Sequence, residues 1–298
     1  MPWNSEVGLK PPRAVAVRPP GLMPERAQTG RLRRGERMVV MVYHLLNAPY
    51  RLFSLGTFVE LLRAAKSTVS EDLSFVRQAF DRFHLGKVET LAGAAGGVRY
   101  LPIPGKERMR SLVEELCQRL RDPTRLLPGG FLYTSDLSST PRYATALGEA
   151  LAGLFGENRP DVVLTVEVKG IPLALMTARA FDVPLVTIRR GAHVTEGPAV
   201  SVNYVSGSSK TVQSMTLPLR AVMPGSKVLF IDDFLRAGGT ARGVHDLMRE
   251  FRAEVIGIGV FIETTAPRQK MIDRYVSLIE FGGVNDRGEI LVSPSRWL

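Results

Sequence analysis

Apolar residues recur with helical spacing in the first third of the chain. Over residues 36–47 they stand three and four positions apart, which predicts a helix that Pro49 stops. The same spacing predicts a second helix over residues 55–65, with Ser54 as its N-cap. A third helix, with Ser67 as its N-cap, is predicted to follow.

Two short runs with strand character come next, at residues 86–91 and 97–103. A Gly-Ala-Ala-Gly-Gly tip joins them. Three helices and a glycine-tipped hairpin are the elements of a winged helix-turn-helix, which we predict over residues 31–104. A small helical domain without a DNA role is the alternative for this pattern. Residues 1–30 are rich in Pro and Arg without apolar periodicity, and predict a disordered basic arm.

Helical and strand patterns alternate over residues 105–298. Helices are predicted at 106–127, 141–155, 172–181, 240–251 and 268–275; strands at 162–166, 185–187, 228–231 and 255–262; and a hairpin at 200–215. This alternation predicts an α/β domain with a mostly parallel sheet and helices on both faces. Ligands of such sheets bind outside the carboxyl ends of the strands.

Residues 228–240, with the sequence VLFIDDFLRAGGT, form the most informative stretch of the chain. Its first four apolar residues predict a buried strand, and Asp232 and Asp233 follow at the strand's carboxyl end. Gly238 and Gly239 then open a helix, whose N–H groups and positive dipole end attract a phosphate. Paired carboxylates can accept hydrogen bonds from two vicinal hydroxyls of a sugar. The pattern resembles the phosphoribosyl diphosphate (PRPP) signature of the type I phosphoribosyltransferase fold.

Two further loops complement this stretch. Lys169 and Gly170 precede a predicted helix, where a second anion would bind, so the two loops together match a ligand with a monophosphate and a diphosphate. The hairpin that carries Tyr204 and Lys210 is suited to closing over a bound anion. Solvated loops without a ligand are the alternative for both. The predicted effector-binding residues are Lys169, Gly170, Tyr204, Lys210, Asp232, Asp233, Phe234, Arg236, Ala237, Gly238, Gly239 and Thr240.

Composition excludes several classes of protein. A hydrophobic content of 45% and a charged content of 23% are ordinary for a soluble globular protein, and no apolar run approaches the length of a membrane span. The N-terminus lacks the apolar core of a signal peptide, so we expect a cytoplasmic protein. Cys117 lies in an amphipathic helical pattern as a packing residue, and the four His residues lack the spacing of zinc ligands.

The net charge of +10 is unevenly distributed. The first 105 residues hold 15 Lys and Arg against 8 Asp and Glu, whereas the remainder holds 24 against 21. A basic first third on a near-neutral remainder predicts a module that binds a polyanion, and in a winged helix that polyanion is DNA. The predicted DNA contacts are Arg31, Arg33, Arg34, Arg37, Lys66, Ser67, Thr68 and Ser70.

The chain as a whole resembles the purine operon repressor family of bacteria, over roughly residues 31–280. The stretches that carry the resemblance are 66–73 (KSTVSEDL), 93–98 (GAAGGV), 127–130 (LPGG), 194–197 (VTEG), 201–209 (SVNYVSGSS) and 231–240 (IDDFLRAGGT). The resemblance implies a dimeric repressor of purine-biosynthesis genes whose affinity for operator DNA is lowered by PRPP. In this interpretation Mg²⁺ accompanies PRPP near Asp232 and Asp233, and the guanosine tetraphosphate alarmone is a candidate competitor.

A catalytic purine phosphoribosyltransferase of the xanthine or adenine type, with an accessory DNA-binding domain, is the alternative function. Some purine enzymes of the fold place an Asp three residues after the second carboxylate, where this chain has Arg236. An Arg side chain cannot act as a general base. A salvage enzyme also has no use for a basic winged helix. We therefore predict no catalytic residues.

Overall fold

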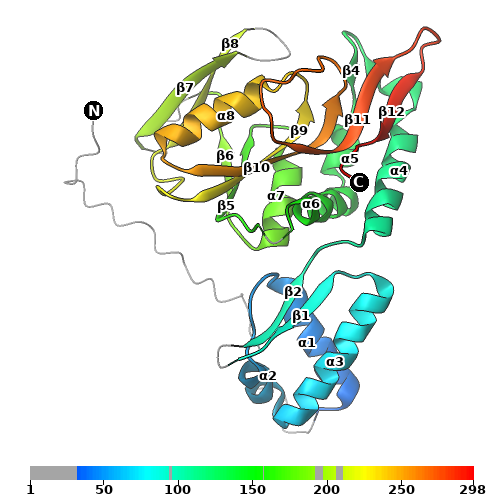
Figure 1. Cartoon of the computed structure of the whole chain (residues 1–298), viewed down its shortest axis with the longest axis vertical. Coiled ribbons are helices and arrows are strands. Elements are labelled where there is room, and N and C mark those ends of the chain that lie inside the picture. Colours follow the sequence, from blue (N-terminus) through cyan, green and yellow to red (C-terminus); the bar gives the residue numbers. More distant parts are fainter. Residues whose placement is uncertain (1–31, 94–95, 157, 192–196, 206–210) are drawn as a thin grey trace.

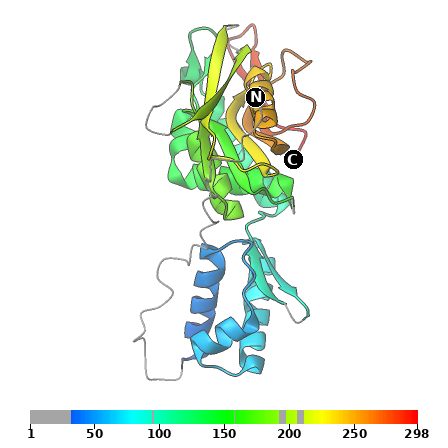
Figure 2. The same ribbon diagram turned by 90° about the vertical axis from the view of Figure 1, so that its left-hand side faces the viewer.

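The computed structural model describes residues 32–93, 96–156, 158–191, 197–205 and 211–298, and these form two bodies (Figure 1). The smaller body is the winged helix, and the larger one is an α/β domain. Figure 2 shows the same two bodies after a quarter turn, stacked along the long axis of the molecule. The elements of the smaller body are α1 (Arg34–Asn47), α2 (Leu55–Leu62), α3 (Lys66–Phe83), β1 (Lys87–Leu91) and β2 (Gly97–Leu101).

The predicted winged helix-turn-helix is confirmed, although two helix ends differ from the prediction. Ser54 caps α2 as predicted, because its hydroxyl accepts a hydrogen bond from the Thr57 N–H at 3.1 Å. That helix ends at Leu62 rather than at residue 65, since Arg63 takes the left-handed conformation with φ +47°. The prediction of Ser67 as a cap is wrong. The third helix begins two residues earlier, with Ala65 at the N-cap position and no side-chain cap.

A small apolar core holds the three helices against the hairpin. Met41, Phe58 and Val69 come from the three helices in turn and are fully buried, and Val98 of β2 joins them. Strands β1 and β2 pair antiparallel from Lys87 opposite Leu101 to Leu91 opposite Gly97, which gives the wing its register. Burial of all three helices on one core fixes the orientation of α3, whose other face is left to solvent.

The larger body is built on a six-stranded sheet with the strand order β12-β11-β10-β9-β5-β6. Its strands are β5 (Val162–Val166), β6 (Leu185–Ile188), β9 (Lys227–Leu235), β10 (Glu254–Thr264), β11 (Val276–Val284) and β12 (Ile290–Pro294). All neighbouring pairs are parallel except β11 and β12. The predicted α/β class is therefore confirmed.

Helices cover both faces of this sheet, as predicted. Alternate residues of β9 point to opposite faces: Leu229 and Ile231 belong to one buried cluster, and Val228 and Phe230 to the other. The first cluster packs under α4 (Lys106–Leu120), α6 (Pro141–Phe155) and α7 (Ile171–Phe181). The second packs under α8 (Gly239–Glu250) and the hairpin of β7 (Ala199–Val205) and β8 (Val212–Pro218). Shorter elements complete the domain: η1 (Pro123–Arg125), β3 (Leu126–Leu127), β4 (Phe131–Leu132) and α5 (Ser135–Ser139).

The C-terminal part of the prediction is wrong in two respects. Residues 268–275, predicted as a helix, form no helix but a connection between β10 and β11, and strands β11 and β12 were not predicted. The connecting helix predicted over 106–127 ends at Leu120, and it packs against β11 and β12. It therefore belongs to the sheet domain. Strands β11 and β12 form the edge of the sheet opposite β6.

The two bodies meet at Tyr50, which follows α1. Its backbone N–H donates to the Tyr100 carbonyl of the wing at 2.8 Å, and its hydroxyl donates to the Gly156 carbonyl at the end of α6 at 3.1 Å. The Tyr50 ring lies 5.3 Å from the ring of Phe181, the last residue of α7, and the Arg159 guanidinium lies 5.6 Å from the Tyr50 ring centre. Tyr50 is therefore a buried joint between the domains.

Within the described part of the chain no helix is both long and apolar enough to cross a membrane. Cys117 lies 1% exposed in α4 within the main core of the sheet domain, which confirms its packing role. Burial raises the pKa of its thiol to about 11. The reactive thiolate is therefore scarce at neutral pH.

Candidate effector site and nucleic-acid interface

The sequence predicted that the Asp pair follows a strand that ends at residue 231. In the structure the pair instead lies within the central strand β9. β9 is flanked by β5 and β10 and runs on to Leu235, so Asp232 is opposite Val260 of β10 in register. The Asp232 Oδ1 accepts a hydrogen bond from the Asp233 N–H at 2.9 Å. The carboxyl end of β9 therefore holds both carboxylates at the edge where parallel strands bind ligands.

The pKa values of both carboxyl groups are raised. Burial raises the pKa of Asp232 well above its ordinary value, and the neighbouring Asp233 carboxylate raises it further. Burial also raises the pKa of Asp233, against the lowering effect of the Lys169 ammonium. Perturbed carboxylates at a strand end mark a binding site. A bound cation would favour the ionised form of the pair.

The phosphate loop, residues 236–240, leads from β9 into α8. Gly238 has φ +86°, in the left-handed region that glycine adopts readily. A side chain there would also lie 3.2 Å from Ile272 Cγ1. Helix α8 begins at Gly239, so its first N–H groups have no partner within the helix and sit at the positive end of its dipole. This geometry suits the anion that the sequence predicted at this loop.

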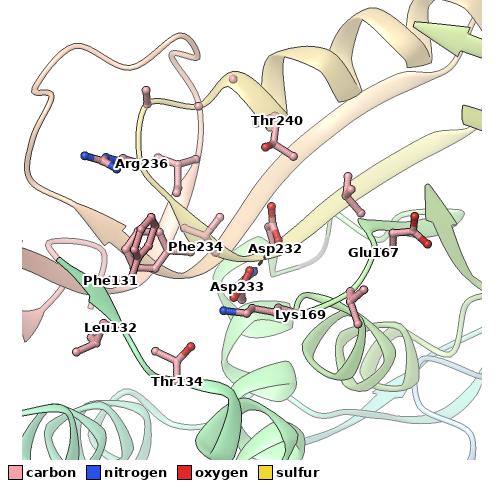
Figure 3. Close-up of a pocket in the computed structure, with 18 of the residues that line it drawn as sticks. Phe131, Leu132, Thr134, Glu167, Lys169, Asp232, Asp233, Phe234, Arg236 and Thr240 are labelled. Atoms are coloured by element: carbon pink, nitrogen blue, oxygen red, sulfur yellow. Dashed lines mark hydrogen bonds between the residues drawn. The ribbon is translucent and has the colours of Figure 1, made fainter. Parts of the chain in front are cut away.

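A second loop, residues 167–170, connects β5 to α7. A Cβ atom at Gly170 would lie 2.5 Å from Thr165 Oγ1 and 3.0 Å from Asp232 Oδ1, so glycine alone fits without a shift of its neighbours. The buried Thr165 hydroxyl has no hydrogen-bond partner among the described residues. Lys169 is exposed, and Figure 3 shows its side chain beside Asp233. The structure thus brings the second predicted anion loop against the Asp pair.

One cavity of about 800 Å³ contains both loops and both Asp residues (Figure 3). Nine of the twelve predicted effector-site residues line it: Lys169, Asp232, Asp233, Phe234, Arg236, Ala237, Gly238, Gly239 and Thr240. Gly170 is not part of the lining but follows Lys169 at the end of the second loop. A volume of this size holds a sugar with several phosphates. The cavity therefore joins the two anion loops into a single site.

Tyr204 and Lys210 have different outcomes. Tyr204 is absent from the cavity lining; it lies buried against α8, where its side chain packs on Gly243 and its hydroxyl donates to Gln213 Oε1 at 2.7 Å. The Tyr204 side chain also interacts with Thr240 of the cavity lining, so Tyr204 as an effector contact stays a prediction. Lys210 lies outside the described residues.

Sequence reasoning missed one wall of the cavity. The hairpin of β3 and β4 and the turn after it contribute Leu127, Pro128, Phe131, Leu132 and Thr134. Gly129 and Gly130 form its turn, both with positive φ, at +82° and +73°. The LPGG stretch had signalled a break in the chain. It could not signal that the break lies across from β9, because that proximity arises only in the folded sheet.

In the winged helix, the structure separates the predicted DNA contacts into two groups. Lys66, Ser67 and Ser70 are exposed on α3, and Thr68 is half-buried. Arg37 instead lies buried, with its Nε 2.7 Å from Asp72 Oδ2 and its Nη1 donating to the Leu32 carbonyl at 2.8 Å. A guanidinium held in this way serves the fold, so we leave Arg37 out of the proposed DNA contacts.

The remaining predicted arginines differ in whether they form ion pairs within the protein. Arg34 reaches Glu71 at 3.0 Å and Asp72 at 3.1 Å, and its guanidinium stacks 3.9 Å from the Phe75 ring centre. Arg33 is exposed and precedes α1. Arg31 lies outside the described residues.

Two exposed cations beside the same helix were not predicted. Arg63 lies in the turn immediately before α3, and Arg77 lies on α3 itself. Their isolated positions in the sequence gave no cluster to notice. Arg63 lies three residues before Lys66, and Arg77 lies eleven residues after it on the same helix. Exposed cations on and before a recognition helix are suited to contacts with DNA phosphates.

Comparisons with known proteins match both bodies. Residues 33–102 match the family model described as bacterial purine repressor, N-terminal, and residues 134–286 match the phosphoribosyl transferase domain. The purine biosynthesis transcriptional repressor PurR of Bacillus subtilis is 42% identical over 86% of this chain and 90% of its own length. The purine biosynthesis transcriptional activator PurR of Lactococcus lactis is 39% identical over 84% of this chain and 92% of its own. A xanthine phosphoribosyltransferase of Deinococcus deserti is 33% identical over 52% of this chain and 80% of its own.

Proposed function

We propose that this chain, which belongs to the family of bacterial purine repressors, binds the operators of purine-biosynthesis genes and leaves them when PRPP binds. The family follows from identity above 40% to a curated repressor over most of both chains. The winged helix supplies the DNA-binding surface, and the cavity at the end of β9 supplies the effector site. Because operator DNA of bacteria lies in the cytoplasm, we propose that the protein acts there.

One observation carries this proposal: two anion loops and a carboxylate pair converge in one cavity on a chain whose other domain is a winged helix. PRPP offers a 5-phosphate to the loop 236–240, two ribose hydroxyls to Asp232 and Asp233, and a diphosphate to Lys169 and Gly170. Each part of the ligand thus meets a complementary group. The guanosine tetraphosphate alarmone also carries diphosphates and would compete for the same loops.

Mg²⁺ fits the site as a companion of PRPP. Among the described residues no group of three or more His, Cys, Asp and Glu side chains could hold a metal ion by itself. Asp232 and Asp233 supply hard oxygen ligands, which Mg²⁺ prefers, and substrate phosphate oxygens usually complete its coordination. The ion would neutralise the diphosphate and favour the ionised Asp pair. We therefore propose that metal and effector enter together.

We further propose that the sheet domain senses PRPP without turning it over. Arg236 stands where some purine enzymes of the fold place an acidic side chain, and a guanidinium cannot accept a proton. The alternative, a xanthine or adenine phosphoribosyltransferase, finds support in the similarity to the xanthine enzyme over half of this chain. Incubation with PRPP, Mg²⁺ and each base distinguishes the two, since only the enzyme releases diphosphate.

The joint between the domains offers a route for the signal. Helix α7 begins beside the loop that ends at Gly170, and its last residue, Phe181, packs on Tyr50 of the winged helix. A shift of α7 on effector binding would thus reach the DNA-binding domain directly. A reduction of the positive potential by the bound polyanion is the other route. By linkage, DNA must weaken PRPP binding by the same factor in either case.

The test is a titration of operator DNA with and without PRPP and Mg²⁺. We expect a homodimer, because winged helix-turn-helix proteins commonly read two half-sites, and a loss of operator affinity when PRPP is added. Equal affinity at saturating PRPP would refute release. Because the relative from Lactococcus lactis carries the name of an activator, transcription from the same operator should be measured in parallel, with repression as the expected sign.

A further inference from the structure

The connection between β10 and β11 lies against the back of the phosphate loop. The Met271 N–H donates to the Ala237 carbonyl at 2.8 Å, and the Ile272 side chain lies where a Cβ of Gly238 would touch it. The connection is therefore a brace for the loop. It comes from a part of the chain that the sequence pattern had assigned to a helix.

Lys270 is the centre of this brace. Its ammonium donates to the Arg236 carbonyl at 2.5 Å and to the Thr264 carbonyl at 2.7 Å, and it lies 3.3 Å from Thr264 Oγ1. An ammonium has three donors, so these three acceptors use all of them. Lys270 has no N–H left to offer to a ligand, and any effect on binding must pass through the loop.

The direction of these bonds is what matters for an anion. The carbonyls of Arg236 and Ala237 both point toward the brace, where Lys270 and Met271 bond to them. A phosphate is bound by N–H groups and repelled by carbonyl oxygens. Holding the carbonyls on the outer side leaves the opposite side of the loop, at the start of α8, to the N–H groups.

We propose that Lys270 is a positioning residue for the effector's 5-phosphate: it fixes the Arg236 carbonyl away from the cavity so that the loop N–H groups face the phosphate. This inference rests on the proposed function of the same site. It assigns a role to a residue that makes no contact with the ligand and does not line the cavity.

A positioning role for Lys270 can be distinguished from a general structural role, because the two anion loops can be tested with different ligands. Ribose 5-phosphate tests the loop at 236–240, inorganic diphosphate tests the loop at 167–170, and PRPP tests both. Lys270→Met keeps the length and apolar stem of the side chain but removes the ammonium. Calorimetry should show binding of PRPP and ribose 5-phosphate weakened about tenfold or more, and binding of diphosphate changed by less than about twofold.

Two variants serve as controls. Arg268→Met removes an exposed positive charge from the same connection and should leave all three affinities within about twofold, because surface charge is screened. Lys270→Arg restores charge and donors and should recover much of the ribose 5-phosphate binding. In the ligand-free Lys270→Met protein, amide hydrogen exchange should accelerate at residues 237–240 and not at residues 168–171.

The outcomes are distinguishable. Wild-type protein that binds no PRPP refutes the proposed function and the brace with it. Wild-type protein that binds PRPP while Lys270→Met binds ribose 5-phosphate equally well refutes the brace alone, as does equal weakening of diphosphate binding. If Lys270→Met melts below the assay temperature, Lys270→Gln replaces it in the same comparison, with the same results expected and the same results refuting the brace.

Discussion

The two domains treat buried charge in opposite ways. In the winged helix, Arg37 and Arg34 reach Asp72 at 2.7 and 3.1 Å, so this buried carboxylate finds its counter-charges inside the fold. In the sheet domain, Asp232 and Asp233 adjoin on one strand, burial raises the pKa of each, and no described residue forms a salt bridge with either. Charge paired internally stabilises a fold, whereas charge left unpaired at a strand end indicates where a ligand supplies the partner.

Breaking the internal pair should have the largest effect. Arg37→Met leaves the Asp72 carboxylate with only Arg34 and should lower the free energy of unfolding of the winged helix by about 3 kcal/mol. Denaturant unfolding, followed by circular dichroism, measures the change. PRPP binding should be unaffected, because the Arg37–Asp72 ion pair lies in the winged helix and the proposed effector site lies in the sheet domain. A loss below about 1 kcal/mol would show that Arg34 alone neutralises Asp72.

Removing the unpaired charge should weaken binding of the ligand and leave the protein folded. Asp232→Ala or Asp233→Ala should cost on the order of 1.5–3 kcal/mol of PRPP binding, the value of a charge-assisted hydrogen bond. Operator affinity without PRPP should stay near normal while release by PRPP is lost, as measured by fluorescence anisotropy of labelled operator. Asp286→Ala, an exposed site between β11 and β12, is the matched control. A double variant that still releases DNA at ordinary PRPP concentrations would exclude the Asp pair from the effector site.

The pH dependence of binding sharpens the same contrast. Because the pKa values of Asp232 and Asp233 are raised, the pair takes up protons at a higher pH than it would in the unfolded chain, and a protonated pair binds no cation. Affinity for PRPP with Mg²⁺ should therefore fall as the pH is lowered, by up to about tenfold per unit for each proton bound. The Asp232→Asn variant, titrated in parallel, separates this effect from protonation of PRPP itself.

The same raised pKa values predict that the stability of the fold, unlike PRPP binding, increases as the pH is lowered. A raised pKa stabilises the folded state below the unfolded pKa, and this contribution is lost as the pH rises through the folded value. At about pH 8 the buried pair is therefore a cost to folding, and Asp232→Asn should raise the melting temperature there. Near pH 4 the difference between the variant and the wild type should shrink. An equal difference at both pH values would contradict the raised pKa.

An exposed cation of the winged helix should contribute more to DNA binding when it forms no ion pair within the protein. Lys66→Ala or Arg63→Ala should weaken binding to every DNA sequence alike and reduce the salt slope of binding by about one unit. Arg34→Ala should change the slope less, because Arg34 is already paired with Glu71 and Asp72. Ser70→Ala should instead alter preference among operator variants. Unchanged slopes for both Lys66→Ala and Arg63→Ala would mean that DNA binds another face.

The joint between the domains should show the smallest effect. Tyr50→Phe removes one hydrogen bond to the Gly156 carbonyl and should change the coupling between PRPP and operator by about 0.5–1.5 kcal/mol, with each ligand alone bound normally. The coupling is the ratio of operator affinities with and without PRPP. If it is unchanged even in Tyr50→Ala, the signal does not pass through α7 and Tyr50, and the electrostatic route is favoured.

Most elements of the fold were predictable because their signals are local. Spacing of apolar residues predicted α6 over residues 141–155 and β5 over residues 162–166 with both bounds as observed. The prediction failed at residues 268–275 and at β11 and β12, where the pattern is ambiguous. An edge pair of strands is specified by the neighbours it pairs with, and these are far away in the sequence.

What the sequence by itself determined is the chemistry of the protein. Adjacent carboxylates, a Gly-Gly-Thr helix start and a basic first third predicted an anion-binding α/β domain joined to a DNA-binding one, since local backbone and charge preferences do not need tertiary contacts. Only the tertiary structure decided which charges are free. Arg37 and Arg63 look alike in the sequence, yet one is buried against Asp72 and the other is exposed beside α3. Likewise, only the crossover of β10 into β11 brings Lys270 to the Arg236 carbonyl. Pairing and burial are relations between distant segments, and they are set when the chain folds.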